Sequence, residues 1–347
     1  MSRIRPEVDS DQIEGESNFS ADEDINLTLW IPSYKRPRDL RLLLQQIQSL
    51  ELWKSLNIIV SDNASDNWDI ADLEEGLTKG IRIERRGCNL SAGANFLRAF
   101  ENCSTEWVHI MGDDDRLNSD YLSIIEQCIG SCDASIAAIK FDTELYGHLK
   151  QEQHKNLTTA ISGIHGDSLN GWFNNLLLIS GWLFRREQMN PYISQAYLGY
   201  GTKLSHLLPA LACCDQENRY ILFSSKRPIV FGENQDSWPK GASWTEMCIN
   251  TQLAHGYLSE TNRRALHKCL FGGSNAKLLA KLMRIRAFYQ RPATDISWLR
   301  ILFVLSTLSK RFMLISLLSL PLLALPTRIW PTQIRKRLGS EGSTDRW

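Results

Sequence analysis

The sequence predicts an α/β fold built on a mainly parallel sheet and followed by a helical region. Between residue 25 and about residue 129, short apolar segments typical of buried strands alternate with apolar residues at helical spacing. Polar clusters follow three of these strands, in the place where parallel sheets bind ligands: PSYKR, SDNASDN and GDDDR. After residue 243 nearly all of the sequence favours helix. A chain of 347 residues is long enough for one large domain with such an appended segment.

Strands and helices alternate from the start of this region. Residues 25–31, INLTLWI, predict a strand that ends at Pro32. The segment 38–50 predicts a helix, because its apolar residues share one face: Leu40, Leu43, Leu44, Ile47 and Leu50. The elements expected next are strands at 57–62, 81–86 and 107–112 and helices near 91–102, opened by Ser91, and around 118–129. From about 136 to 240 the pattern loosens into short strands such as 135–141 and 227–231.

Charge is balanced over the chain but not along it. With 39 basic and 39 acidic side chains, the formal net charge is zero, which argues against nucleic acid as a partner. Residues 1–24 carry eight acidic and two basic side chains, whereas residues 263–347 carry sixteen Lys or Arg and three acidic residues. The eight cysteines form no Cys-x-x-Cys pair, so reduced thiols and a cytosolic compartment are expected. The first thirty residues lack an apolar stretch typical of a signal peptide.

The basic end of the chain is also apolar. Segment 276–291 predicts an amphipathic helix with a basic stripe, and segment 301–325 is long enough to cross a bilayer. Lys310 and Arg311 divide the second segment, and Pro321 interrupts it. Charges at the centre of a bilayer are costly, so helices lying in the interface of an anionic membrane are favoured. A spanning helix and a bundle packed on the main domain are the alternatives.

Three consecutive carboxylates, Asp113, Asp114 and Asp115, follow the predicted strand at 107–112. Gathering this much negative charge is unfavourable unless a cation or hydrogen bonds compensate it. Carboxylate oxygens suit Mg²⁺ or Mn²⁺, and these ions also bind the oxygens of a diphosphate. The pattern therefore favours a divalent cation held against a diphosphate, with a solvated turn as the alternative.

Two further polar clusters lie at neighbouring strand ends. Asp62 and Asp66 in SDNASDN can accept hydrogen bonds from a nucleobase or a ribose, although an Asx-rich turn would look the same. Arg85 and Arg86 close the strand at 81–86, and NLSAGAN at 89–95 opens a helix whose first amides could face phosphate. A capped helix with surface arginines is the alternative.

Four motifs in order resemble the family 2 glycosyltransferases of the GT-A fold, a Rossmann-like fold of transferases that use nucleotide-diphosphate sugars. They are LTLWIPSYKRPRDL, IIVSDNASDN, NLSAGAN and WVHIMGDDDRL, and together they cover residues 25 to about 125. The resemblance implies a GT-A domain at 25–240, with a donor half at 25–140 and an acceptor half at 141–240. The composition of residues 1–24 predicts a flexible acidic segment before it. A basic, helical, membrane-associating region is then expected at 241–347.

The resemblance also implies roles for individual residues. Those expected to bind the nucleotide sugar are Pro32, Ser33, Tyr34, Arg36, Asp62, Asn63, Arg85, Arg86, Asn89, Asn95 and Asp113. Asp114 and Asp115 are expected to bind Mn²⁺ or Mg²⁺. The sequence departs from the family at Gly112, where an Asp is usual, so which of the three carboxylates touches the metal stays open.

A second departure concerns the catalytic base. Many members carry a Glu-Asp pair roughly ninety residues further on, whose Asp takes the proton of the acceptor hydroxyl. Here that stretch reads GYGTKLSHLLPAL, without a carboxylate. His206 stands at about that place and is the candidate base, with a core or capping histidine as the alternative. Asp215, Glu217 and Glu187 are the carboxylates that would be candidate bases if the alignment with the family were shifted.

The expected reaction is a metal-dependent inverting transfer of a sugar from a nucleotide-diphosphate donor to a saccharide hydroxyl. ISGWLFRRE followed by a His-containing helix resembles the abequosyltransferase-like branch of O-antigen and surface polysaccharide enzymes. A lipid-linked acceptor, such as a polyprenyl-diphosphate saccharide, at the cytoplasmic face of the inner membrane would explain the basic, apolar end. The rival functions are a nucleotidyltransferase, for which PSYKRPRD lacks the glycines, and a degenerate GT-A scaffold.

Overall fold

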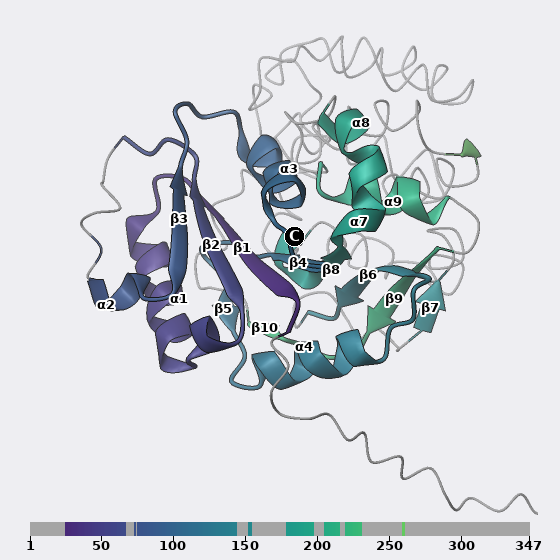
Figure 1. The fold of residues 1–347 in the computed structure, drawn as a ribbon, viewed down its shortest axis with the longest axis horizontal. Coiled ribbons are helices and arrows are strands. Elements are labelled where there is room, and N and C mark those ends of the chain that lie inside the picture. The colour runs from purple at the N-terminus through teal and green to yellow at the C-terminus, as the bar shows by residue number, and fades with distance from the viewer. Residues whose placement is uncertain are drawn as a thin grey trace, which may run out of the picture.

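The computed structural model describes residues 25–66, 73, 75–143, 152–154, 178–197, 205–215, 219–230 and 259–260. These residues form an eight-stranded sheet with the order β3-β2-β1-β4-β8-β6-β9-β7, and a small sheet of β10 and β5 (Figure 1). The strands of the large sheet are β1 (Leu27–Ser33), β2 (Asn57–Asp62), β3 (Ile81–Arg85), β4 (Trp107–Ile110), β6 (Ile136–Phe141), β7 (Glu152–His154), β8 (Trp182–Arg185) and β9 (Tyr220–Ser224). The small sheet pairs β5 (Arg116–Leu117) with β10 (Ile229–Val230).

Helices cover both faces of the large sheet. They are α1 (Pro37–Ser49), α2 (Glu75–Thr78), α3 (Ala92–Asn102), α4 (Tyr121–Gly130), α7 (Arg186–Met189), α8 (Ile193–Tyr197) and α9 (Leu207–Cys214). Short 3₁₀ turns are η1 (Leu52–Lys54), η3 (Ile179–Gly181) and η4 (Asn190–Tyr192). Figure 1 shows α1 and α4 on one side of the sheet and α3 with α7, α8 and α9 on the other. This covering explains why the central strands β1 and β4 are buried at every residue instead of alternating between buried and exposed positions.

The sheet is mainly parallel, as the sequence predicts, with two reversals. β3, β2, β1 and β4 are parallel neighbours. β8 is antiparallel to both of its neighbours, β4 and β6, and β7 is antiparallel to β9. The expected donor and acceptor halves, 25–140 and 141–240, therefore share one sheet, because β8 inserts between two strands of the first half.

The first strand is longer than predicted. β1 continues through Pro32 to Ser33, and both residues pair with β2. Trp30 turns its carbonyl towards β4, where it accepts a hydrogen bond from the Met111 amide. Pro32, two residues on, faces the same side, and β4 ends at Ile110, so no ladder hydrogen bond is lost there. The strand can therefore carry a proline and still reach the edge of the sheet with Ser33.

Other boundaries differ from expectation by a few residues. β4 ends at Ile110 instead of residue 112, and α4 begins at Tyr121 instead of residue 118. Ser91 stands at the N-cap of α3 as predicted, but its side chain makes no capping hydrogen bond. Its φ of 82° is left-handed, whereas a capping serine needs an extended backbone.

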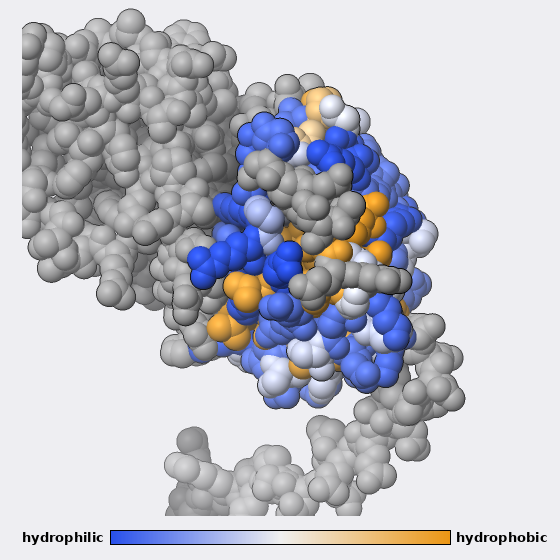
Figure 2. Space-filling model, turned by 90° about the vertical axis from the view of Figure 1, so that its left-hand side faces the viewer, coloured by the Kyte–Doolittle hydropathy of each residue, from blue (hydrophilic) through white to orange (hydrophobic). Residues whose placement is uncertain are grey.

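The surface over the β3 edge is mostly hydrophilic. Figure 2 views this side of the molecule and shows hydrophilic residues around smaller hydrophobic areas. β3, the edge strand, has the sequence IRIER and a half-exposed burial pattern. Charged side chains on an edge strand discourage pairing with another chain.

The predicted membrane-associating region lies outside the described residues, except for residues 259–260. The acidic segment 1–24 and the segments 276–291 and 301–325 lie outside them as well. Within the part of the chain that the structure describes, no helix is long and apolar enough to cross a bilayer.

Helix α1 offers a matched test of the core. Leu43 is fully buried and its neighbour Leu42 is 42 % exposed. Leu43→Ala is expected to lower the free energy of unfolding by about 2–5 kcal/mol, because it removes buried methyl groups and leaves a cavity. Leu42→Ala is expected to change it by less than about 0.5 kcal/mol. Urea unfolding of both variants checks this, and equal losses would contradict the orientation of α1.

His109 on β4 provides a test of pH dependence. Its Nε2 donates to the Ser180 carbonyl at 2.8 Å, so its Nδ1 accepts from the Tyr121 hydroxyl at 2.7 Å. Burial lowers the pKa of His109 to about 4, and the charge of Lys140 adds to this, while the bond to Ser180 opposes it. Since the unfolded histidine titrates near pH 6.5, the unfolded chain binds more protons between about pH 6.5 and 4, and stability falls as the pH falls.

Between pH 7 and pH 5, the native protein is therefore expected to lose about 2 kcal/mol more unfolding free energy than His109→Gln. Denaturant unfolding of the two proteins at both pH values measures this difference. An identical pH dependence would show that His109 titrates normally in the folded protein.

Candidate active site

The three polar clusters predicted at strand ends meet at one edge of the sheet. Ser33 Oγ, at the end of β1, donates to Asp113 Oδ2 beyond β4 at 2.7 Å. The amide of Lys35 donates to Ser65 Oγ beyond β2 at 2.8 Å. Parallel strands end at the same edge, so groups of residues 30 and 80 positions apart come into contact. This confirms the expected juxtaposition.

Arg36 compensates the acidic triplet. Its Nη1 lies 3.0 Å from Asp113 Oδ1 and 2.8 Å from Asp114 Oδ2. Asp113 is only 3 % exposed, and burial raises the pKa of its carboxyl to about 6, against the attraction of Arg36 and the hydrogen bond from Ser33. Burial lowers the pKa of Arg36, but the charges of Asp113 and Asp114 outweigh it, so the guanidinium stays protonated.

Gly112 leaves room for the other two carboxylates. A Cβ at this position would lie 3.0 Å from Asp114 Oδ1 and 3.2 Å from Asp115 Oδ2. These two oxygens therefore converge on the same side of the Gly112 backbone. A side chain at position 112 would crowd both oxygens, and they would have to move by a few tenths of an ångström to accommodate it.

Ser180, which sequence reasoning missed, holds the turn of residues 112–115, called here the acidic turn. Its hydroxyl accepts from the Gly112 amide at 2.8 Å and donates to Asp115 Oδ2. Ser180 precedes β8, whose antiparallel pairing with β4 brings it beside the turn. A serine in a poorly patterned segment gives no local signal, because the contact spans 68 residues.

The carboxylate oxygens of the acidic turn supply part of the ligand shell that a divalent cation needs. Oδ1 of Asp114 and Oδ2 of Asp115 are hard oxygen donors that converge over Gly112. Among the described residues, no group of three or more His, Cys, Asp or Glu side chains has the arrangement of a metal site. Such an incomplete protein shell is typical of Mg²⁺ or Mn²⁺ bound through one or two carboxylates together with substrate phosphates.

A second cluster of bonded polar side chains lies at the end of β2. Asp62 is 1 % exposed, and its Oδ1 accepts from the Ser65 hydroxyl at 2.6 Å. Arg85 approaches Asp62 at 3.6 Å and donates to the Ser65 carbonyl at 2.7 Å. Asn63 Nδ2 donates to Asn89 Oδ1 at 2.8 Å, which ties the end of β2 to the loop before α3.

Two of the predicted donor-binding residues are occupied by contacts within the protein. Asn95 accepts from Ser61 Oγ at 2.6 Å and donates to the Ser61 carbonyl at 2.9 Å, so it fixes α3 to β2. Arg86 lies over the Trp30 ring and pairs with Glu84 at 2.7 Å. Tyr34, in contrast, is 38 % exposed beside the end of β1.

His206 is buried at the start of α9. It is 1 % exposed and packs edge-on against Phe96, and neither ring nitrogen has a hydrogen-bond partner among the described residues. Its neighbour Ser205 donates to the Gly93 carbonyl at 3.2 Å, which joins α9 to the first turn of α3. Burial lowers the pKa of His206 to about 3, and the charge of Lys140 adds to this, so the imidazole is neutral.

The other candidate bases lie elsewhere or are engaged. Asp215 accepts hydrogen bonds from the amide and hydroxyl of Ser259 at 2.7 and 2.8 Å. Glu187 follows β8, which runs away from the acidic turn for four residues, about 13 Å. Glu217 lies outside the described residues.

Lys140 is a second residue that sequence reasoning missed. It is fully buried in β6, and its ammonium donates to the carbonyls of Phe141 and Gly181 at 2.9 and 3.2 Å. A Cβ at position 181 would overlap this ammonium, so the Lys140 side chain would have to shift if the glycine were replaced. Burial lowers the pKa of Lys140 to about 7.

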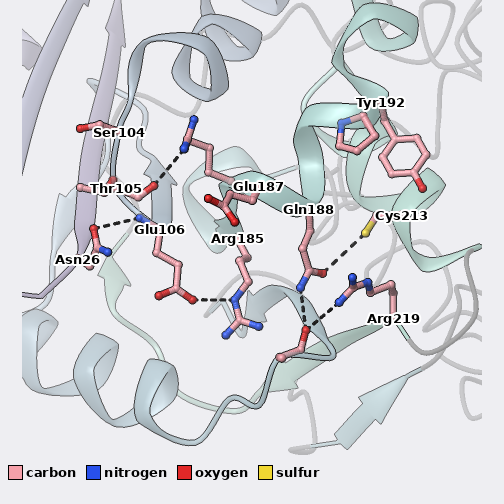
Figure 3. Close-up of a pocket in the computed structure, with 13 residues that line it drawn as sticks. Asn26, Ser104, Thr105, Glu106, Arg185, Glu187, Gln188, Tyr192, Cys213 and Arg219 are labelled. Carbon is pink, nitrogen blue, oxygen red and sulfur yellow. Dashed lines mark hydrogen bonds and ion pairs between the residues drawn. The ribbon is translucent and has the colours of Figure 1, made fainter.

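A cleft of about 690 Å³ lies at the opposite end of the strands (Figure 3). Its polar groups are largely bonded to one another: Arg185 pairs with Glu106 at 3.0 Å, and Gln188 and Arg219 both donate to the Ala134 carbonyl. None of the predicted donor or metal residues lines it. The sheet edge that carries Asp62 and the acidic turn, called the acidic edge, is therefore the candidate active site.

Comparison with known proteins agrees with this geometry. The family model described as Glycosyl transferase family 2 matches residues 28–187. No curated protein matches the chain. The solved structure of S. aureus TarS 1–349 is similar, with a TM-score of 0.53 at 12 % identity over 92 % of each chain.

A mannosyltransferase, PcManGT from Pyrobaculum calidifontis, solved in complex with GDP-Man and Mn²⁺, has a TM-score of 0.51 at 12 % identity, covering 94 % of this chain and 88 % of that one. At these identities the likeness shows the fold. The family match covers residues 28–187, less than half of the chain, and both solved structures share the fold, so the chain is a glycosyltransferase similar to those of family 2.

Proposed function

We propose that this glycosyltransferase moves a sugar, with inversion, from a nucleotide-diphosphate donor to a hydroxyl of a saccharide acceptor, with Mn²⁺ or Mg²⁺ as its metal. One observation carries the proposal: the Asp113–Asp115 turn and the Asp62 cluster meet at the carboxyl edge of a parallel sheet. This edge of a parallel α/β sheet is where such folds bind nucleotides.

The residues of the edge have separate tasks in this proposal. Asp62, held by Ser65, accepts hydrogen bonds from the nucleobase, and Asn63 and Asn89 brace the loop beside it. Asp113, steadied by Ser33, accepts from the ribose. Asp114 and Asp115 supply the converging oxygens that would hold the divalent cation. When bound, the cation neutralises the charge that develops on the diphosphate leaving group.

His206 is the candidate base for the acceptor hydroxyl. Its position at the start of α9, against the first turn of α3, supports this role. Its neutral ring and open nitrogens allow it to accept a proton. With a pKa near 3, however, the buried ring is a weak acceptor, so the role requires that acceptor binding changes its surroundings.

The acceptor we propose is a lipid-linked saccharide of the polyprenyl-diphosphate type, used in O-antigen or surface polysaccharide synthesis at the cytoplasmic face of the inner membrane. The sixteen basic residues and apolar stretches of residues 263–347 support attraction to an anionic lipid surface. ISGWLFRRE and the His206 helix support the abequosyltransferase-like branch. In this proposal the C-terminal region and the acceptor share one membrane surface.

The metal role is tested with detergent-purified full-length protein and a panel of nucleotide sugars. With Mn²⁺ present, Asp114→Asn is expected to release nucleoside diphosphate at least about 100-fold more slowly than the native protein, because one cation ligand is lost. Asp120→Asn is the matched control, since Asp120 is an exposed aspartate on the same segment. Equal release by Asp114→Asn and Asp120→Asn would remove the metal assignment.

The base is tested by His206→Asn. Transfer to an acceptor is expected to fall by about 10²- to 10⁴-fold, while the affinity for nucleoside diphosphate stays within a few-fold of the native value. Donor affinity and circular dichroism serve as checks on folding. If transfer were retained within a few-fold, His206 would be a core histidine and the proton would go to another group.

A further inference from the structure

We propose that Arg36 is the resident counter-cation of the acidic turn, and that a divalent cation must displace its guanidinium before the donor diphosphate binds. The inference rests on the proposed metal-dependent transfer and adds a competitor that sets metal affinity. In this order of events, Arg36 first pairs with the carboxylates, the divalent cation then replaces it, and the diphosphate binds last.

The contact geometry places one guanidinium nitrogen against two of the three carboxylates. Nη1 of Arg36 touches both Asp113 Oδ1, at 3.0 Å, and Asp114 Oδ2, at 2.8 Å. The other Asp113 oxygen is already bonded to Ser33 Oγ at 2.7 Å. The same Asp114 carboxylate carries Oδ1, one of the two oxygens that would hold the cation. Arg36 and a divalent cation would therefore compete for the negative charge of one carboxylate, and their positive charges would repel each other.

The turn after β1 holds Arg36 in this position. The amide of Lys35 is tied to Ser65, and its ammonium pairs with Asp66 at 2.7 Å. Lys35 has a left-handed φ of 57°, and Pro37 begins α1 directly after Arg36. The proline disfavours the helical region for Arg36, whose φ and ψ are −125° and 56°, so its backbone has less freedom than that of other residues. The pairing is thus built into the local chain.

The side chain of Arg36 is nevertheless free enough to move. It is 33 % exposed, whereas the side chain of Asp113 is only 4 % exposed. A guanidinium released from the carboxylates suits the oxygens of a diphosphate, which it can bind through two parallel hydrogen bonds. Cation and diphosphate would then favour each other's binding: the cation frees Arg36, and Arg36 helps to bind the diphosphate. By linkage, each ligand should raise the affinity of the other by the same factor.

The test measures Mn²⁺ binding to the full-length protein directly, from the electron paramagnetic resonance signal of free Mn²⁺. Without nucleotide, Arg36→Gln is expected to bind Mn²⁺ about tenfold more tightly than the native protein, because the competitor is gone. The factor by which added UDP or GDP raises Mn²⁺ affinity is expected to shrink in the same variant. Arg38→Gln, an exposed arginine two residues on, is the matched control and should behave as native.

Two further variants separate this inference from the proposed function. Arg36→Lys keeps the charge without the planar fork, and its affinity for Mn²⁺ is expected to lie between those of the native protein and Arg36→Gln. Asp114→Asn is expected to weaken Mn²⁺ binding in every background. If Asp114→Asn weakened binding but Arg36→Gln did not strengthen it, the competition would be refuted and the metal site would stand. If no protein bound Mn²⁺, both proposals would fail.

Discussion

The parallel register of β1 between β2 and β4 is the constraint on which the site depends. It places Ser33 directly opposite Asp62 and Trp30 opposite Ile110. The offset of 80 residues between Trp30 and Ile110 is the same offset that separates Ser33 from Asp113. A slip of one residue would turn alternate side chains to the other face and break these contacts. The buried, apolar strands resist such a slip, because both of their faces pack against helices.

Charge compensation is the second physical theme of the site. Asp62 and Asp113 are almost completely buried, and an isolated buried carboxylate is costly. Each is therefore met by a serine hydroxyl and by an arginine: Ser65 and Arg85 for Asp62, and Ser33 and Arg36 for Asp113. The acidic edge thus balances its own charge before any ligand binds. A ligand that binds to Asp62 or Asp113 therefore has to replace some of these hydrogen bonds and ion pairs.

The second half of the domain supports this edge from the side. β8 runs against its neighbours, so the residues that precede it, and not those that follow it, lie beside the acidic turn. Ser180 holds that turn, and the buried ammonium of Lys140 binds the carbonyl of Gly181 next to it. Both histidines at hand, His109 and His206, are kept neutral by burial. Burial likewise lowers the pKa of Lys140 to about 7, so these three buried groups add little positive charge to the site.

The sequence by itself determined the alternation of strands and helices up to about residue 129 and the three polar clusters at strand ends. These follow from local patterns, because an apolar run, a helical period and a carboxylate after a strand are each visible within about fifteen residues. α1 and β2 agree with the prediction almost residue for residue. Only the tertiary structure decided that β8 inserts between β4 and β6, that Ser180 holds the acidic turn, and that Arg36 pairs with Asp113. These contacts join residues 41 to 80 or so positions apart, and their energy comes from burial and charge pairing that no local segment contains.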